Sequence, residues 1–91
     1  MVYLITYDLN KAGKDYAGLL PAIKSLSPEW RKPLLSTWLV DTSLSAQQIY
    51  DRLERYIDSD DRLLISRIHR GSQGWLAQVD GEWINSWNRT Y

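Results

Sequence analysis

Residues 1–9 read Met1-Val-Tyr-Leu-Ile-Thr-Tyr-Asp-Leu9, an apolar stretch that ends on a carboxylate. In a β-strand the even positions (Val, Leu, Thr) and the odd positions (Tyr, Ile, Tyr) would face opposite sides of a sheet. Both sides are then largely apolar, which predicts a strand at 2–7 that is covered on both faces. Asp8 follows it, at a strand end where a fold can present a charged side chain.

The rest of the chain alternates between helical and extended patterns. The predicted elements are a helix starting after Asp15, an extended region at 34–42 that bends near residues 36–37, a helix after Ser45, a strand at 62–69 and a short helix after Asp80. Ser45 and Gln48 form a capping-box pattern, which makes the helix after Ser45 the clearest element. Pro21 either kinks the first helix or lies in the first turn of a helix that begins later.

This order of elements predicts an α+β fold, a ferredoxin-like sandwich with a largely antiparallel sheet and two helices on one face. Residues 1–70 would form that domain. Gly71 to Gly74 would be a flexible joint, and residues 71–91 a Trp-rich extension that packs on the same domain or on a partner protomer. Because two helices cover only one face, the other apolar face of the first strand predicts a homodimer.

Composition narrows the function classes. Eleven basic and eleven acidic side chains give a net charge of zero, so no overall positive field attracts nucleic acid. The chain has no cysteine, which excludes disulfides and thiolate metal sites. We find no secretory signal and no apolar segment of membrane-spanning length, and therefore expect a soluble cytoplasmic protein that does not enter membranes.

Three short motifs occur in an order that resembles a known group of proteins. They are Tyr7-Asp8-Leu9 at the end of the first strand, Ser36-Thr37-Trp38 in the bent region, and Asp60-Asp61-Arg62-Leu63-Leu64-Ile65 at the start of a later strand. Over residues 2–68 the chain resembles the Cas2 proteins associated with CRISPR. Within the wider Cas2/VapD-like superfamily it is most similar to small Cas2-like proteins, sometimes labelled SinR-like.

The resemblance implies a ferredoxin-like homodimer whose sheets face each other. It also implies that Asp8 from both protomers holds Mg²⁺ near the dimer axis, with Ser36 beside it. The activity would be metal-dependent endonuclease cleavage of RNA or DNA in prokaryotic defence. Two departures argue against a role as a DNA adaptor. Tyr16-Ala17-Gly18 stands where Cas2 proteins often carry arginine, and the basic surface of DNA-bound Cas2 is missing from this neutral chain.

Each candidate polar residue also has a structural explanation. Asp8 could cap the following turn and bind no metal. The basic side chains most suited to contact phosphate are Arg62, Arg67 and Arg70, with Lys11 and Lys14 in the loop after Asp8. The three arginines could instead pair with the acidic segment 41–61, and the two lysines could simply be solvated. Asp41, also at a strand end, is explained by turn chemistry.

The tryptophans of the extension lead to a second class of function. Trp75, Trp83 and Trp87 could dock a partner or stack on bases, or they could be buried as core. We favour burial, because Trp83 and Trp87 would share one helix face. Two functional hypotheses follow: a Mg²⁺-dependent endonuclease with Asp8 and Ser36 at its site, and a non-catalytic dimeric adaptor or regulator that binds a protein or small ligand.

Overall fold

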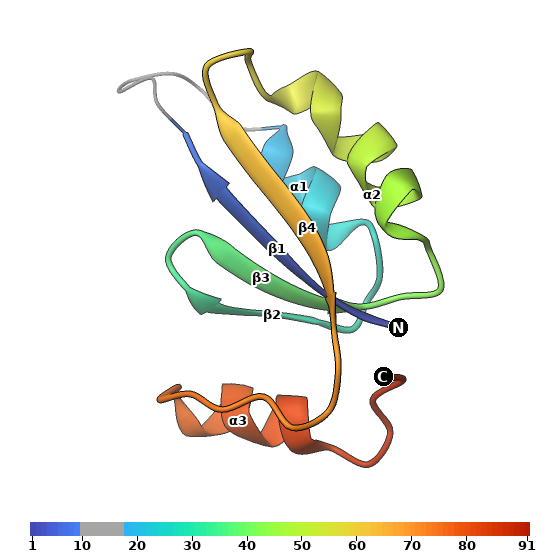
Figure 1. The fold of residues 1–91 in the computed structure, drawn as a ribbon, viewed down its shortest axis with the longest axis vertical. Coiled ribbons are helices and arrows are strands. Elements are labelled where there is room, and N and C mark those ends of the chain that lie inside the picture. The colour runs from blue at the N-terminus through green and yellow to red at the C-terminus, as the bar shows by residue number, and fades with distance from the viewer. Residues whose placement is uncertain (10–17) are drawn as a thin grey trace.

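The computed structural model describes residues 1–9 and 18–91. The strands and helices in the described residues are β1 (Val2–Asp8), α1 (Leu19–Lys24), β2 (Trp30–Leu34), β3 (Thr37–Asp41), α2 (Ala46–Leu53), the 3-10 helix η1 (Glu54–Tyr56), β4 (Arg62–Ile68) and α3 (Gln78–Asn85). Figure 1 shows α1 and α2 together on one side of the sheet and α3 on the other, with the two ends of the chain close together.

The four strands form one antiparallel sheet in the order β2-β3-β1-β4. Along the chain, α1 lies between β1 and β2, and α2 lies between β3 and β4, so each helix connects two strands that are not neighbours in the sheet. This arrangement confirms the predicted α+β fold, a ferredoxin-like sandwich with two helices on one face and a further C-terminal helix. Along β1 the register opposes Ile5 to Trp38 on β3 and to Ile65 on β4.

The main core lies between the sheet and helices α1 and α2. Its buried members are Tyr3, Ile5, Leu19, Ile23, Leu26, Trp38, Val40, Ile49 and Leu53. The Trp38 side chain has 1 % of its surface exposed and its ring nitrogen donates to the Tyr7 hydroxyl at 3.2 Å. The odd positions of β1 therefore face the helices, as the alternation of the first strand predicts.

Helix α2 begins with a side-chain cap, whereas helix α1 has none. The capping box of α2 is present, with the Ser45 hydroxyl accepting from the Gln48 amide at 3.1 Å and the Gln48 side chain accepting from the Ser45 amide at 2.9 Å. Helix α1 begins at Leu19 with Gly18 as N-cap, so Pro21 lies in its first turn. Of the two predictions for Pro21, the later helix start is therefore confirmed and the kinked helix is wrong. The predicted cap at Asp15 lies outside the described residues.

The extended region in the middle of the chain is a hairpin that starts earlier than the sequence suggested. Strand β2 begins at Trp30 and contains Pro33, so it starts before the extended region predicted at 34–42. The register shifts between Arg31 and Leu34, and β2 is an edge strand of the sheet. An edge strand next to an irregularity tolerates proline, because not every amide there has to join the ladder.

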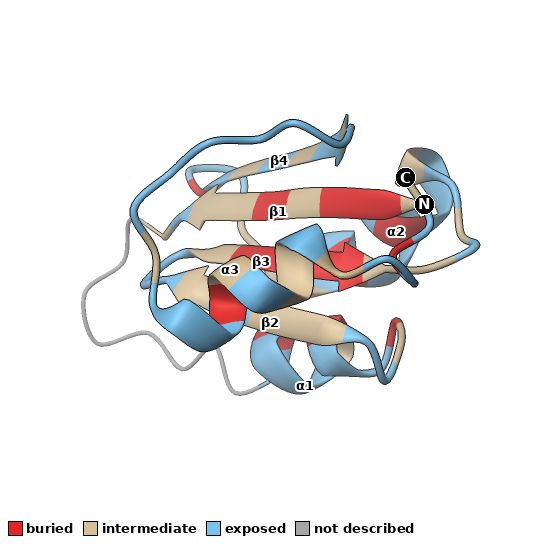
Figure 2. Cartoon of the chain, turned by 90° about the horizontal axis from the view of Figure 1, so that it is seen from below, coloured by how far each residue is buried: buried red, intermediate tan, exposed pale blue. Residues whose placement is uncertain are grey.

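The opposite face of the sheet is covered in part by the chain's own C-terminal segment. Val2 and Leu39, which point away from α1 and α2, are 0 % and 4 % exposed within a single chain. Figure 2 shows α3 lying across β3 and β2 on that side. A partner protomer is therefore not needed to bury these two residues, although Leu64 on the same face is 60 % exposed. Dimerisation stays a prediction.

Helix α3 is held to the sheet by an ion pair that the sequence did not predict. Asp80 does not cap the helix, which begins at Gln78 after Ala77. Its buried carboxylate instead accepts from the Nε of Arg31 at 2.6 Å. Across the described part of the chain, each helix is too short or too polar to cross a membrane.

Candidate functional site

The predicted catalytic residues lie at one end of the sheet. Asp8, the exposed last residue of β1, stands opposite Arg62 in the β1–β4 register. The carbonyl oxygen of Ser36 accepts from the Tyr7 amide at 3.1 Å and from the Thr6 hydroxyl at 3.2 Å. The structure thus brings Asp8, Ser36 and Arg62 to the same end of the sheet. Ser36 contacts β1 through its main-chain carbonyl.

A shallow groove of about 390 Å³ runs beside this edge, lined by Thr6, Tyr7, Asp8, Arg62, Leu63 and Leu64. Within the described residues, Asp8 belongs to no group of three or more side chains that could ligate a metal together. A Mg²⁺ ion often takes one or two carboxylates and completes its shell with water or phosphate oxygens. Asp8 could therefore supply one ligand, and the other ligands would have to come from water, nucleic acid or a second copy.

A group of three carboxylates lies on the loop between η1 and β4, directly before Arg62. Oxygens of Asp58, Asp60 and Asp61 lie within 4.8 Å of one another. The Asp61 carboxylate accepts from the Asp58 amide at 2.8 Å, and the Asp61 amide donates back to the Asp58 carbonyl at 3.1 Å. These bonds close the turn before β4, so turn formation accounts for the buried Asp61.

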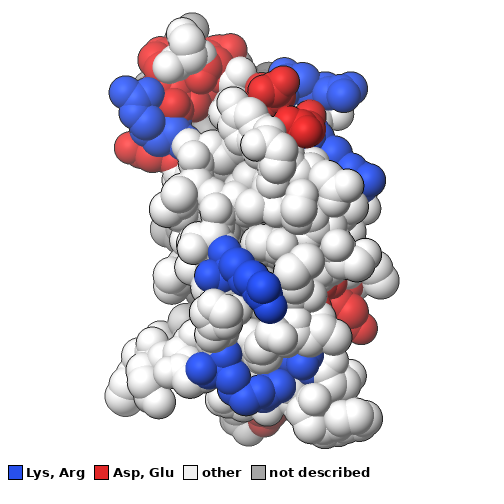
Figure 3. All heavy atoms as spheres, turned by 45° about the vertical axis from the view of Figure 1, so that its right-hand side comes forward, with Lys and Arg blue, Asp and Glu red and all other residues white. Residues whose placement is uncertain are grey.

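The predicted phosphate-contacting arginines do not form one cluster. Arg62 and Arg67 have opposite parity on β4 and so face opposite sides of the sheet. Arg70 lies beyond the other end of the strand, where its guanidinium bonds to the Ser86 carbonyl and stacks on the Tyr91 ring at 4.7 Å. On the face shown in Figure 3, the basic side chains form separate groups. Lys11 and Lys14 lie outside the described residues.

The three tryptophans of the extension have different environments, and two of them are not buried within a single chain. Trp75 and Trp87 are 99 % and 90 % exposed. Trp83 is partly buried, with the Arg89 guanidinium 4.2 Å from its ring centroid. Helix α3 ends at Asn85, before Trp87, so Trp83 and Trp87 do not share one helix face. Tryptophan is enriched at protein–protein interfaces relative to the rest of the surface.

Trp75 lies at a groove of about 440 Å³ between the segment that precedes α3, α3 itself and the β2–β3 hairpin. The groove is lined by Leu34, Ser72, Gln73, Gly74, Trp75, Leu76, Ala77, Gln78, Gly81, Ile84 and Asn85. None of these residues is charged, although 24 % of the chain is. Depletion of charge with an exposed aromatic side chain is the composition typical of the centre of a protein interface. We call this surface the Trp75 groove.

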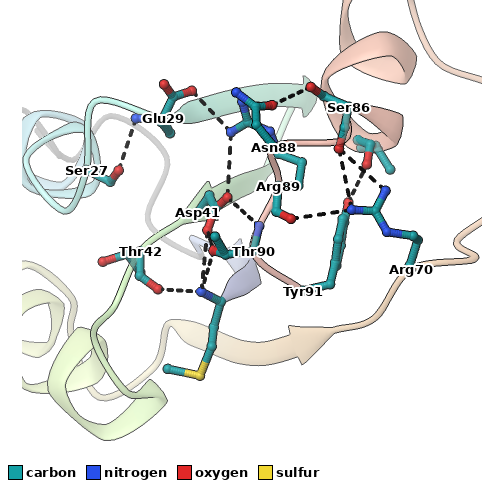
Figure 4. A network of polar contacts seen from close by, with 12 residues as sticks. Ser27, Glu29, Asp41, Thr42, Arg70, Ser86, Asn88, Arg89, Thr90 and Tyr91 are labelled. Carbon is teal, nitrogen blue, oxygen red and sulfur yellow. Dashed lines mark hydrogen bonds and ion pairs between the residues drawn. The ribbon is translucent and has the colours of Figure 1, made fainter.

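A second polar cluster fixes the end of the chain to β3, and we call it the Asp41 latch (Figure 4). The Asp41 carboxylate accepts from the Thr90 amide at 2.9 Å and from the Thr90 hydroxyl, and lies 3.7 Å from Nη1 of Arg89. Arg89 also pairs with Glu29 at 3.1 Å, and the α-amino group of Met1 lies 3.4 Å from Asp41. Only 8 % of the Asp41 side chain and 6 % of the Arg89 side chain are exposed.

Electrostatics of the latch follow from this burial. Burial alone would raise the pKa of Asp41, but the hydrogen bonds from Thr90 and the nearby α-amino group together hold the pKa below its usual value. Burial raises the pKa of Tyr91 above its usual value, against the opposing effect of Arg70 and Arg89. Sequence reasoning assigned Asp41 to turn chemistry and did not single out Arg89. Nothing in the local sequence around Asp41 indicates that its partner Thr90 lies 49 positions away.

Comparison with known proteins adds no further assignment. No family model matches the chain, and no solved structure gives a significant match.

Proposed function

We propose that this protein is a non-catalytic adaptor or regulator that binds its partner through the Trp75 groove. The observation that carries the proposal is the 99 % exposure of Trp75 at the rim of a groove without charged residues. Exposed tryptophans that insert into a partner are the side chains that contribute most binding free energy at interfaces. A nucleic-acid ligand is disfavoured at this groove, because none of its lining residues is a cation that could neutralise phosphate.

Selection from a random peptide phage library on the immobilised protein tests this proposal. We expect enrichment of apolar peptides on the wild-type protein and on Trp87→Ala, and none on Trp75→Ala. Trp87 is the matched control because it is almost equally exposed but does not line the groove. Equal enrichment on Trp75→Ala would show that peptides do not bind through Trp75, and no enrichment on the wild-type protein would show that the Trp75 groove is not a peptide-binding surface.

A second candidate function is the Mg²⁺-dependent cleavage of RNA or DNA that the Cas2-like resemblance implies. The specific observation in its favour is that exposed Asp8 and Arg62 face each other at an open end of the sheet. In this proposal Asp8 would hold the ion and Arg62 would contact phosphate, with Ser36 nearby. The ion would supply charge stabilisation and an activated water.

Cleavage of single- and double-stranded RNA and DNA, measured with Mg²⁺ and with EDTA, tests the second candidate. We expect activity that EDTA removes and that Asp8→Ala loses. Asp51→Ala is the control, since Asp51 is an exposed carboxylate on α2 that accepts from the Gln47 side chain at 2.9 Å. Activity that is equal in the wild-type protein and in Asp8→Ala excludes Asp8 as a catalytic residue.

A further inference from the structure

We propose that the occupant of the Trp75 groove is a second copy of this chain, bound across a two-fold axis so that Trp75 of each protomer fills the groove of the other. The inference rests on the proposed binding role of the Trp75 groove and names its partner. A two-fold interface uses the same patch on both copies, so each patch has to contain both the inserted group and its receptor. The patch around Trp75 contains both.

The first argument is that the groove and the indole complement each other. Trp75 is 99 % exposed, and the groove beside it has a volume of about 440 Å³ with Leu34, Leu76 and Ile84 among its walls. This volume accommodates an indole ring. Gly81 lines the groove as well, and no atom lies within 4 Å of where its Cβ would be, so the groove is open at this point.

The second argument comes from the main chain next to Trp75. In the described part of the chain, the amides and carbonyls of residues 73–76 make no backbone hydrogen bond. The segment is outside the helices and strands, so the main-chain groups on both sides of Trp75 are not part of a helix or sheet in the single chain. Two such segments related by a two-fold axis run antiparallel, which is the orientation in which extended segments pair through their main chains.

The third argument concerns charge. Each copy brings the same surface to the interface, so any charge on that surface would face a like charge near the axis. The Trp75 groove has no charged lining residue, and self-association therefore meets no repulsion there. A charged peptide or a nucleic acid would find no counter-charge on the same surface.

The available area sets the expected affinity. An inserted Trp buries about 150–250 Å² of its own surface, and it covers a similar area of the groove wall on the partner. Each protomer would then lose about 300–500 Å² through the exchange, to which the exposed Leu34 and Leu35 side chains add. This area is below the roughly 800 Å² per partner of a standard stable interface, so we expect a weak dimer whose population depends on protein concentration.

Sedimentation velocity over a range from about 1 μM to about 1 mM protein tests the proposal. We expect the wild-type protein and Trp87→Ala to dimerise with dissociation constants that agree within about threefold, because Trp87 lies outside the groove. Trp75→Ala should weaken dimerisation by at least about thirtyfold, as expected for the loss of a central aromatic residue. Gly81→Leu should weaken it similarly by filling the groove while Trp75 stays intact.

A mixture of the two variants distinguishes exchange of Trp75 from other modes of association. Trp75→Ala keeps the groove walls at Leu34, Leu76 and Ile84, and Gly81→Leu keeps the indole, so one of the two exchanges can form between them. The mixture should associate more tightly than either variant alone and less tightly than the wild-type protein. A mixture that associates no better than the variants would overturn the exchange geometry.

The outcomes also separate this inference from the proposed function. A wild-type protein that stays monomeric at about 1 mM, but still selects peptides through Trp75, would overturn the second copy as partner and leave the binding surface standing. A dimer that Trp75→Ala does not weaken would overturn this interface. Absence of both Trp75-dependent dimerisation and Trp75-dependent peptide selection would overturn the inference and the proposed function together.

Discussion

The Asp41 latch should contribute a measurable part of the free energy of unfolding. In Asp41→Asn the side chain keeps its shape, but Arg89 loses one of its two carboxylate partners, and the bonds to Thr90 lose their charge assistance. Removing one member of a buried ion pair costs about 3–5 kcal/mol when the other is left unpaired. Arg89 here keeps Glu29 at 3.1 Å and the ring of Trp83, so we expect a loss of about 2 kcal/mol.

The matched control is Glu29→Gln, which removes the other carboxylate partner of Arg89. Glu29 has 55 % of its side chain exposed, and an exposed ion pair contributes about 0–1 kcal/mol after solvent screening. Urea denaturation followed by circular dichroism measures both variants at neutral pH. If the two variants lose the same free energy of unfolding to within about 0.5 kcal/mol, the latch is not stabilising in the way that we infer.

The pH dependence of the difference in stability between the wild-type protein and Asp41→Asn gives an independent check, and its sign can be predicted. The pKa of Asp41 is lowered in the folded protein from its ordinary value of 3.8. A lowered pKa means that the unfolded chain binds the proton more readily, so the contribution is complete above that ordinary value and is lost as the pH falls through the folded pKa. The difference in stability between the wild-type protein and Asp41→Asn should therefore be constant near neutral pH and shrink at acid pH. A difference that grows on acidification contradicts the assignment.

Three further substitutions test the local structure by urea denaturation. Gly18→Ala should destabilise the protein by about 1–3 kcal/mol, because its Cβ would lie 2.5 Å from a ring carbon of Tyr56, and an unchanged midpoint would show that the ring can move aside without cost. Gly81→Ala should stabilise the protein by about 0.5–1 kcal/mol, because it adds a helix-favouring methyl group to α3 in open space, and a loss of stability would contradict the described groove. Ser45→Ala should cost about 1 kcal/mol through loss of the cap on α2, and a neutral result would show that the capping box is not formed in solution.

Local sequence signals predicted the elements whose stability is itself local. The capping box at Ser45 depends on residues three positions apart, and the structure contains it as predicted. The alternation in β1 predicted which side chains share a face of the sheet, since a period of two fixes the face of every residue once one is placed. The order of the elements was then sufficient for the ferredoxin-like sandwich, because antiparallel hairpins and two crossover helices allow few other arrangements.

The features that sequence reasoning missed depend on contacts between distant positions. Asp80 has the residue type of a helix cap, but Arg31 lies within 2.6 Å of it on β2 and bonds to it instead. The bonds between Asp41 and Thr90 likewise join positions 49 residues apart. Exposure of Trp75 was hidden for the same reason, since whether a tryptophan is buried depends on which surface the extension meets. A pattern within the extension contains no information about that surface.

The latch and the Trp75 groove are physically linked, because the same C-terminal segment forms both. The Asp41–Arg89 pair and the Arg31–Asp80 pair hold this segment to the sheet, and α3 forms one wall of the groove while Leu34 on β2 lies on the other side. We call the C-terminal segment docked when these two ion pairs hold it to the sheet. A ligand that binds only the docked segment stabilises the docked state by mass action. Self-association through the Trp75 groove therefore predicts that the resistance of the wild-type protein to urea increases with its concentration, whereas that of Trp75→Ala does not. Asp41→Asn should weaken dimerisation although Asp41 does not line the groove, because the segment that carries Trp75 would be docked for a smaller fraction of the time.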